Sequence, residues 1–327
     1  NVDSPSEKVL VITLQNNSTK KITTFGLGEF APSKETEHLD VEWIGCKDEY
    51  TLLKTFLEWW EENCPDVITG WNSNLFDMPY LITRTERILG EGEHKRFSPF
   101  GLVNKRPIRF ANREMTAFEI TGVAQLDYLD LYKKFTYVTR ESYKLDFIAE
   151  TELGKNKLES GFDTFKEFYD NDWNRFVEYN IIDTVIVDEL EDKMQLIQLA
   201  LTMAYDAKCN FGDVFSPVRI WDSLIYNYLW EKKIVVGQGG GRKDRQIEGA
   251  YVQEPVPGSY EWVSSFDATS LYPSILMQHN MSPETIVPGF QYEVSVDDQL
   301  DRYKLDKLKE KNYTMAGNGS CFTREKK

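Results

Sequence analysis

The chain has 327 residues, of which 41% are hydrophobic and 13% aromatic, enough for the cores of two folded domains. A formal net charge of −15 argues against a protein that binds duplex DNA over its whole surface, because neutralising phosphates takes Lys and Arg. Scattered cysteines and histidines argue against a disulfide framework or a zinc site, and the lack of a signal peptide or of an apolar run of about 18 residues predicts a cytoplasmic protein without membrane contact.

The amino-terminal part of the chain has the spacings of a mixed α/β (α+β) core. Two apolar runs joined by a turn-rich segment predict a hairpin. After Asp48, a helix cap, apolar residues recur at helical spacing from Leu52 to Trp60. The expected strands span residues 8–14, 22–25, 39–44 and 67–70, and a second helix spans 75–89. In this order the elements resemble a ribonuclease-H-like core.

Further along, strand-like pieces between residues 95 and 130 suit a projecting β-hairpin. A long helix is expected over 165–204 and another over 217–228. The glycine run Gly237–Gly241 breaks this pattern. Because no Gly-Lys-Ser/Thr follows it, we interpret it as a flexible connector at a domain boundary rather than a phosphate-binding loop.

The sign of the charge reverses between His94 and Arg113, a stretch without acidic residues. A local basic segment is typical of an edge that contacts nucleic acid, and the alternative is an ordinary solvated loop. The candidate DNA-binding residues are Lys95, Arg96, Lys105, Arg106, Arg109 and Arg113.

Two segments about a hundred residues apart carry candidate metal ligands. Asp77 starts a helix directly after a core strand, where a plain helix cap is the alternative. Tyr179 and Asp183 are four residues apart and so share one helix face. A carboxylate there could hold a divalent ion while the phenol orients the attacking water, as phosphodiester hydrolysis with two metal ions requires. Mg²⁺ fits, because it prefers a few carboxylates and retained waters.

A third candidate, Asp267, follows the apolar run Val263–Phe266, which reads as a short strand. The turn after it could direct the backbone N–H groups of residues 270–272 at phosphate oxygens, and Pro273 suits a helix start. Such a turn suits a metal-bound triphosphate. Taken alone, an Asp in this place is usually only a turn cap.

These motifs together carry a family resemblance. Gly70–Tyr80 reads GWNSNLFDMPY, Tyr179–Asp183 reads YNIID and Asp267–Ile275 reads DATSLYPSI. The chain thereby resembles the family B DNA polymerases, of the type found in T-even-like bacteriophages. The resemblance implies a 3′-5′ proofreading exonuclease in which Asp77 and Asp183 bind metal and Tyr179 assists catalysis.

For the polymerase site, the resemblance implies that Asp267 binds both catalytic metal ions and that the Ala268 carbonyl binds one of them. The backbone of Ser270, Leu271 and Tyr272 would hold the incoming deoxynucleoside triphosphate. The Tyr272 ring would be the steric gate that excludes a ribose 2′-hydroxyl.

Other segments also match the family. Gly249 and Ala250 would touch the template strand, and the hairpin between residues 95 and 130 would help to hold template and primer apart. Asp127 and Asp146 lie in segments beside the exonuclease motifs. We interpret their side chains as caps and turn residues rather than metal ligands.

The family's first exonuclease motif, a strand carrying D-x-E, is not found where the resemblance places it. Asp40 and Glu42 match the D-x-E pattern, but they precede the first long helix instead of lying on the first strand. We therefore expect a fragment whose nuclease is impaired. Its expected parts are a truncated exonuclease domain at 1–195, a helical linker at 196–238 and the first part of a polymerase palm at 239–327.

The first hypothesis for function is a piece of a replicative DNA-directed DNA polymerase with proofreading exonuclease, using two Mg²⁺ per site, for which Mn²⁺ can substitute. Its implied partners are primer–template and single-stranded DNA, dNTPs, and a sliding clamp and other replisome proteins through parts of the family outside this sequence. Two alternatives are a subunit of a split polymerase that acts as a DNA-binding scaffold, and a stand-alone exonuclease that uses Asp40 and Glu42.

Overall fold

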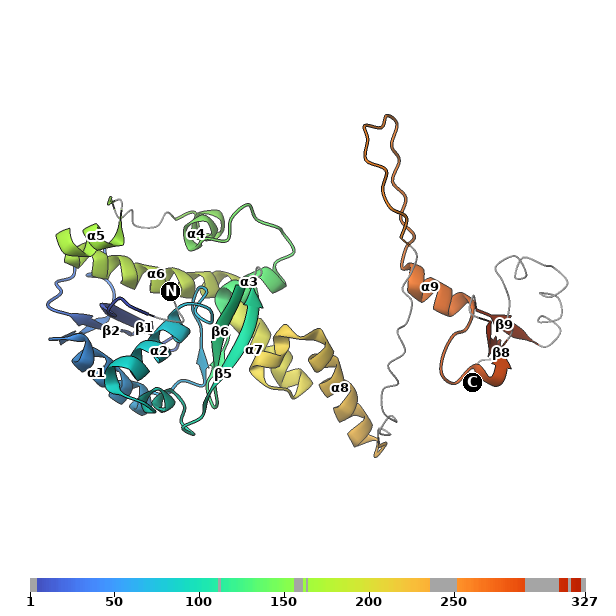
Figure 1. Ribbon diagram of the computed structural model, residues 1–327, viewed down its shortest axis with the longest axis horizontal. Coiled ribbons are helices and arrows are strands. Elements are labelled where there is room, and N and C mark those ends of the chain that lie inside the picture. Colours follow the sequence, from blue (N-terminus) through green and yellow to red (C-terminus); the bar gives the residue numbers. More distant parts are fainter. Residues whose placement is uncertain are drawn as a thin grey trace. The chain divides into compact units, whose positions relative to one another are not determined.

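The computed structural model describes residues 5–110, 113–155, 161–162, 164–235, 252–291, 312–316 and 319–324. The chain divides into two compact units, Asn1–Arg242 and Lys243–Lys327, and each is described by itself (Figure 1). Within the described ranges, no helix combines the length and apolar character needed to span a bilayer.

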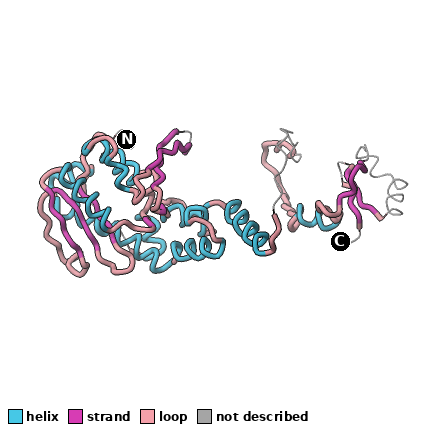
Figure 2. Tube along the Cα trace, turned by 90° about the horizontal axis from the view of Figure 1, so that it is seen from below, coloured by secondary structure: helices cyan, strands magenta, loops and turns pink. Residues whose placement is uncertain are grey.

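The first unit is built on a three-stranded sheet of order β1-β2-β3. Figure 2 draws the strands in magenta among the cyan helices. Its strands are β1 (Val11–Gln15), β2 (Ile22–Leu27) and β3 (Val41–Cys46). β1 and β2 pair antiparallel as the predicted hairpin, and β3 pairs parallel to β2. The expected strands are therefore confirmed, with ends shifted by a few residues.

The central strand β2 is buried on both faces, and helices cover each of them. Phe25 packs with residues of α1 (Glu49–Glu62), whereas Ile22, three residues earlier and so on the opposite face, packs with Val177 of α6 (Trp173–Met194). Figure 1 shows α1 and α6 on opposite sides of the strands. The sheet is thus the middle layer of an α/β sandwich, and α6 is held against it by apolar contacts.

Helix α1 follows the predicted pattern. Asp48 caps it by accepting a hydrogen bond from the Thr51 backbone N–H at 2.8 Å. Trp60 is 1% exposed and donates its indole N–H to the Phe97 carbonyl at 3.0 Å. This bond fixes α1 to the short 3₁₀ helix η1 (Glu93–Phe97) that follows α2 (Asp77–Leu89).

Two smaller sheets complete the strands of this unit. β4 (Val67–Ile68) pairs parallel with β7 (Ala124–Gln125), so the carboxyl ends of these strands lie side by side. β5 (Val103–Phe110) and β6 (Arg113–Ile120) form a separate antiparallel hairpin, as predicted.

Helices make up the remainder of the first unit. They are α3 (Tyr128–Phe135), α4 (Leu145–Leu153), α5 (Phe165–Asn171), α6, α7 (Leu196–Ala207), η2 (Phe211–Phe215) and α8 (Pro217–Glu231). The single helix expected over 165–204 is wrong. The chain breaks at Asp172, which leaves helical geometry to cap α6, and at Gln195, which adopts a left-handed φ of 54°.

The second unit contains α9 (Leu271–Gln278) and a sheet of order β8-β10-β9, formed by Ile286–Gln291, Ser320–Thr323 and Tyr313–Met315. The strand predicted over Val263–Phe266 is wrong, because no neighbouring strand pairs with this segment in the described ranges and its apolar side chains are exposed. The helix begins at Leu271, two residues before Pro273.

Candidate active site

The turn between β4 and α2 places Asp77 at the first position of its helix, close to the positive end of the helix dipole. A Cβ on Gly70 would lie 2.9 Å from the Ser73 Cβ, so only glycine permits this close turn. Asn72 has a left-handed φ of 66°, which Asn tolerates better than most residues. The Ser73 carbonyl then accepts the Met78 N–H at 2.9 Å and leads into α2.

A buried carboxylate holds this turn from the neighbouring strand. Asp127, 2% exposed, follows β7 and caps α3, where it accepts the Leu129 N–H at 3.0 Å. It also accepts the backbone N–H groups of Asn72 at 3.0 Å and Asn74 at 2.9 Å. Burial raises the pKa of Asp127, whereas these N–H donors lower it by stabilising the anion.

Tyr179 and Asp183 lie one turn apart on α6, as predicted. Both side chains are half-buried. The Tyr179 ring makes edge-to-face contacts with Phe165 and Phe168 of α5, with ring centroids 6.0 and 5.8 Å away. These contacts fix the position of the ring on the helix face that carries Asp183.

Charged residues on both of the other segments affect the pKa of Asp77. Burial of its carboxyl group raises the pKa of Asp77 to about 6, and the negative charges of Asp127 and then Asp183 contribute to the rise. The residue as a whole still has exposed surface. A residue whose carboxyl group is packed among protein atoms while its remaining surface reaches solvent fits a site that is open on one side. The charge of Asp183, from a separate motif, is thus the smaller of two acidic contributions to the raised pKa of Asp77.

The donor chemistry of Asp77 and Asp183 fits a divalent cation, because Mg²⁺ prefers carboxylate ligands and positive charge stabilises an ionised carboxylate whose pKa is raised. In the described ranges, however, no group of three or more Asp, Glu, His or Cys side chains is arranged to hold a metal. Glu42 forms an ion pair with Lys21 at 2.8 Å on the surface of the sheet. The two acidic residues are thus a partial ligand set that needs water or substrate oxygens to complete it.

The polymerase-like motif has a different character. Phe266 is 94% exposed, Tyr272 is 69% exposed, and Asp267 is exposed as well. Ser270 caps the start of α9 with a left-handed φ of 48°. Asp267, Ala268 and the residues up to Tyr272 share one turn and helix start, as expected, but none of their side chains is buried.

The basic segment is partly neutralised. Arg96 forms a two-pronged ion pair with Glu61 at 2.6–2.7 Å and a second pair with Glu93 at 3.1 Å. Lys105 lies 3.7 Å from Glu86. Lys95 and Arg106 are exposed. The side chains of Arg109 and Arg113, and all of Gly249 and Ala250, lie outside the described part of the chain.

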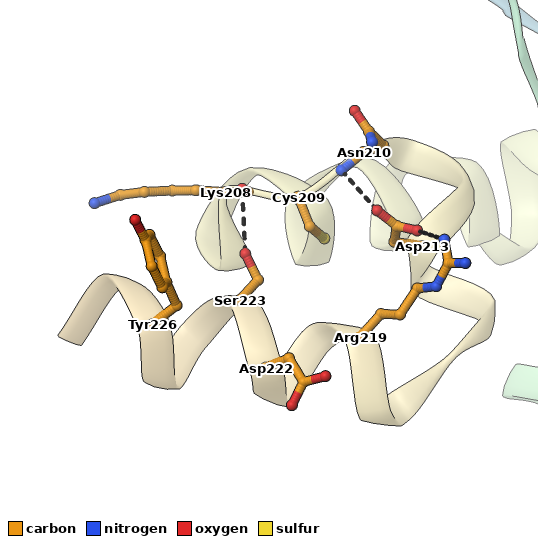
Figure 3. Close-up of a pocket in the computed structure, with 8 residues that line it drawn as sticks. All are labelled: Lys208, Cys209, Asn210, Asp213, Arg219, Asp222, Ser223 and Tyr226. Atoms are coloured by element: carbon orange, nitrogen blue, oxygen red, sulfur yellow. Dashed lines mark hydrogen bonds and ion pairs between the residues drawn. The ribbon is translucent and has the colours of Figure 1, made fainter. Parts of the chain in front are cut away.

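A depression with a volume of about 620 Å³ lies elsewhere, between the end of α7 and α8 (Figure 3). Two of its charged groups form an ion pair: Arg219 lies 2.6 Å from Asp213, which also accepts the Asn210 N–H at 3.3 Å. Ser223 donates to the Lys208 carbonyl at 3.3 Å. None of the predicted site residues lines this depression.

Asp127 is a helix cap, as predicted, but its bonds to the turn before Asp77 were not predicted. A signal existed. Both segments follow short apolar strands, and carboxyl ends of parallel neighbours meet at one edge of a sheet. The pairing of β4 with β7 was not predictable from spacing alone.

Comparison with known proteins decides the family. Residues 3–148 match the description "DNA polymerase family B, exonuclease domain", and residues 216–327 match "DNA polymerase family B". The chain belongs to the family B DNA polymerases.

Among curated relatives of this family B chain, the DNA-directed DNA polymerase of Escherichia phage RB69 is 41% identical over 248 residues, covering 75% of this chain and 27% of the relative. That of Enterobacteria phage T4 is 40% identical over 245 residues, with the same coverage. A DNA polymerase of Pyrococcus glycovorans is 28% identical over 246 residues, 73% of this chain and 31% of the relative. The chain thus spans about a quarter of the length of the phage relatives that it matches.

Proposed function

We propose that this chain supplies the 3′-5′ exonuclease region and the first part of the palm of a DNA-directed DNA polymerase. The observation that carries the proposal is the match of residues 3–148 to the family B exonuclease domain, within which Asp77 occupies the first position of α2. In a family B chain, a carboxylate at the start of α2 and a second one on α6 whose charge contributes to the raised pKa of the first favour metal-assisted phosphodiester hydrolysis.

In the proposed exonuclease, Asp77 and Asp183 hold divalent metal, with Mg²⁺ preferred and Mn²⁺ as a substitute. The bound ions would generate the water nucleophile and stabilise charge on the phosphate. Tyr179, fixed by Phe165 and Phe168, would hold the attacking water through its phenol oxygen. The half-buried position of Tyr179 and Asp183 limits access of bulk water.

For the palm we propose that Asp267 and the Ala268 carbonyl bind the catalytic metal ions. The backbone of Ser270, Leu271 and Tyr272 would hold the triphosphate, and the Tyr272 ring would exclude ribonucleotides. The exposure of Asp267 and Tyr272 is compatible with these roles, because neither side chain is engaged in a core.

Further parts of the proposal concern organisation and partners. The regions 1–195, 196–238 and 239–327 would be exonuclease, linker and palm. Primer–template DNA, single-stranded DNA and dNTPs would be bound, with clamp and replisome contacts elsewhere in the polymerase, in the cytoplasm of the host cell. Lys95, Arg106 and Arg109 are the proposed DNA contacts of the basic segment, and Gly249 and Ala250 those at the template strand.

The test is degradation of 3′-labelled single-stranded DNA by the chain in Mg²⁺ or Mn²⁺, beside Asp183→Ala prepared identically. Cleavage by the unmutated chain alone supports the assignment of Asp183. Equal cleavage by both would reveal a contaminating nuclease.

Mn²⁺ binding, followed by the electron paramagnetic resonance signal of the free ion, should accompany this assay. If the chain binds Mn²⁺ and Asp77→Asn does not, the metal site is supported even where cleavage is slow. If neither protein binds Mn²⁺, the proposed exonuclease site is wrong for this chain.

A second candidate function follows from the partial ligand set. In the part of the chain that the structure describes, no third acidic residue joins Asp77 and Asp183 in a ligating group. A DNA-binding scaffold that becomes catalytic only with further carboxylates would bind single-stranded DNA without degrading it.

A further inference from the structure

The Asp127 carboxylate connects two chain segments that both leave the β4–β7 pair. One oxygen accepts the N–H groups of Leu129 in α3 and Asn72 in the turn, and the other accepts the N–H of Asn74. Hydrogen bonds to a charged acceptor are about twice as strong as neutral ones. The carboxylate is 2% exposed, so water cannot replace these bonds.

We propose that Asp127 is a positioning residue of the exonuclease site, which fixes the Asn72–Asn74 turn and thereby the place of Asp77. This inference rests on the proposed function of Asp77 as a metal ligand. Asn72 is left-handed at a φ of 66°, a geometry that a side-chain anchor stabilises. Asn72 also starts the path to α2, because its carbonyl accepts the N–H groups of Leu75 and Phe76.

The geometry distinguishes this role from two simpler ones. Both oxygens of Asp127 already accept backbone N–H groups, which leaves a metal ion little access to it. A helix cap alone needs only bonds to N–H groups of its own helix, whereas the bonds to Asn74 and Asn72 cross to another segment, 53 and 55 residues away along the chain. Asp127 therefore acts on Asp77 through the turn rather than on substrate.

One substitution separates capping from positioning. Serine is a good helix cap, but its side chain has a single oxygen and is one bond shorter than that of Asp. Asp127→Ser should keep α3 capped while it loses the bonds to Asn72 and Asn74. The matched control is Asp130→Ser, in the first turn of the same helix and exposed.

Two readouts are measured on the full chain. In ¹⁵N-asparagine-labelled protein, hydrogen exchange of the Asn72 and Asn74 amides should accelerate about tenfold or more in Asp127→Ser and stay unchanged in Asp130→Ser. Mn²⁺ affinity should fall about 10- to 100-fold in Asp127→Ser, the usual range for a residue that orients a metal ligand. Asp77→Asn supplies the reference for loss of the metal site.

The outcomes separate the two proposals. Faster amide exchange together with weaker Mn²⁺ binding supports the positioning role. If the parent binds Mn²⁺, Asp77→Asn does not, and Asp127→Ser binds as the parent does, the positioning role is overturned and the metal site stands. If the parent itself binds no Mn²⁺, the metal site and the positioning role are both wrong. Unchanged hydrogen exchange of the Asn72 and Asn74 amides in Asp127→Ser would show that even the turn does not depend on the carboxylate.

Discussion

Two regions of the molecule carry an acidic motif, and their surroundings differ. Asp77 starts a helix that packs into the core of the first unit, and charges from two other segments act on it. Asp267 lies in an exposed segment between Phe266, 94% exposed, and a helix with no buried residue. Both motifs are equally clear in the sequence. Only the segment around Asp77 is held in place by packing within its own unit. A motif therefore specifies a turn, whereas the surrounding core positions the side chains of the site.

The reason lies in what holds each helix. Val177 and Ile181 of α6 pack against Ile22 of the central strand, which fixes the helix that carries Asp183. The apolar residues of α9, among them Ile275 and Leu276, are 38% and 49% exposed. The exonuclease-like region should therefore lose much stability when its core is altered, and the palm-like segment should lose little.

The largest effect is expected at the buried ion pair between α1 and α2. Arg84 and Glu49 are 6% and 7% exposed and bond at 2.7 Å, and Arg84 also donates to the Pro5 carbonyl at 3.1 Å. Arg84→Met leaves the Glu49 charge buried and should cost about 3–5 kcal/mol of unfolding free energy. Urea denaturation measures it. A loss of unfolding free energy below about 1 kcal/mol would mean that the Arg84–Glu49 pair contributes no more than an exposed ion pair does.

A matched pair of leucines sharpens the contrast between the two units. Leu57 in α1 is fully buried, so Leu57→Ala should cost about 2–5 kcal/mol through lost burial and a cavity. Leu276→Ala in α9, where the side chain is half-exposed, should cost less than about 1 kcal/mol. Thermal unfolding followed by circular dichroism compares them. Equal losses would contradict the difference drawn between the two regions.

The raised pKa of Asp77 predicts a pH-dependent stability. The folded state holds the proton up to about pH 6, whereas an unfolded Asp releases it near pH 3.9, so this contribution is complete below that value and is lost as the pH rises through 6. Asp77→Asn should match the parent at pH 4 and be more stable at pH 8. After a discount for solvent exposure, the gain is about 1 kcal/mol.

The measurement for Asp77→Asn is the melting temperature from pH 4 to pH 8 without divalent metal. Mn²⁺ at pH 8 should reverse the order by stabilising the parent alone. A pH-independent difference between the two proteins would disprove the cause assigned here to the raised pKa.

The smallest effect concerns the basic segment. Arg106 is exposed, and Arg106→Ala should weaken single-stranded DNA binding a few-fold and reduce the salt slope by about 0.7. Arg96 is the control, because its ion pairs with Glu61 and Glu93 already occupy the guanidinium. Fluorescence anisotropy at several salt concentrations gives both slopes. If substitution of Arg96 weakened DNA binding more than substitution of Arg106, the proposed assignment of Arg106 as a DNA contact would be wrong.

Much of the local structure was predictable. The cap at Asp48, the hairpin of β5 and β6 and the shared face of Tyr179 and Asp183 follow from spacing and side-chain chemistry. The breaks at Asp172 and Gln195 were missed, because the helical periodicity continues through both while the backbone does not. The strand before Asp267 was predicted from its apolar run, yet a strand also needs a partner to accept its hydrogen bonds.

The sequence by itself determined the family, the three motifs and the residues that carry them, because these depend on residue identity at short spacing. Only the tertiary structure decided that the charges of Asp127 and Asp183 act on Asp77, that Asp127 holds the turn between β4 and α2, and that Arg96 is already paired. Those relations join residues that lie tens to more than a hundred positions apart. They arise from sheet pairing and core packing, which no local pattern specifies.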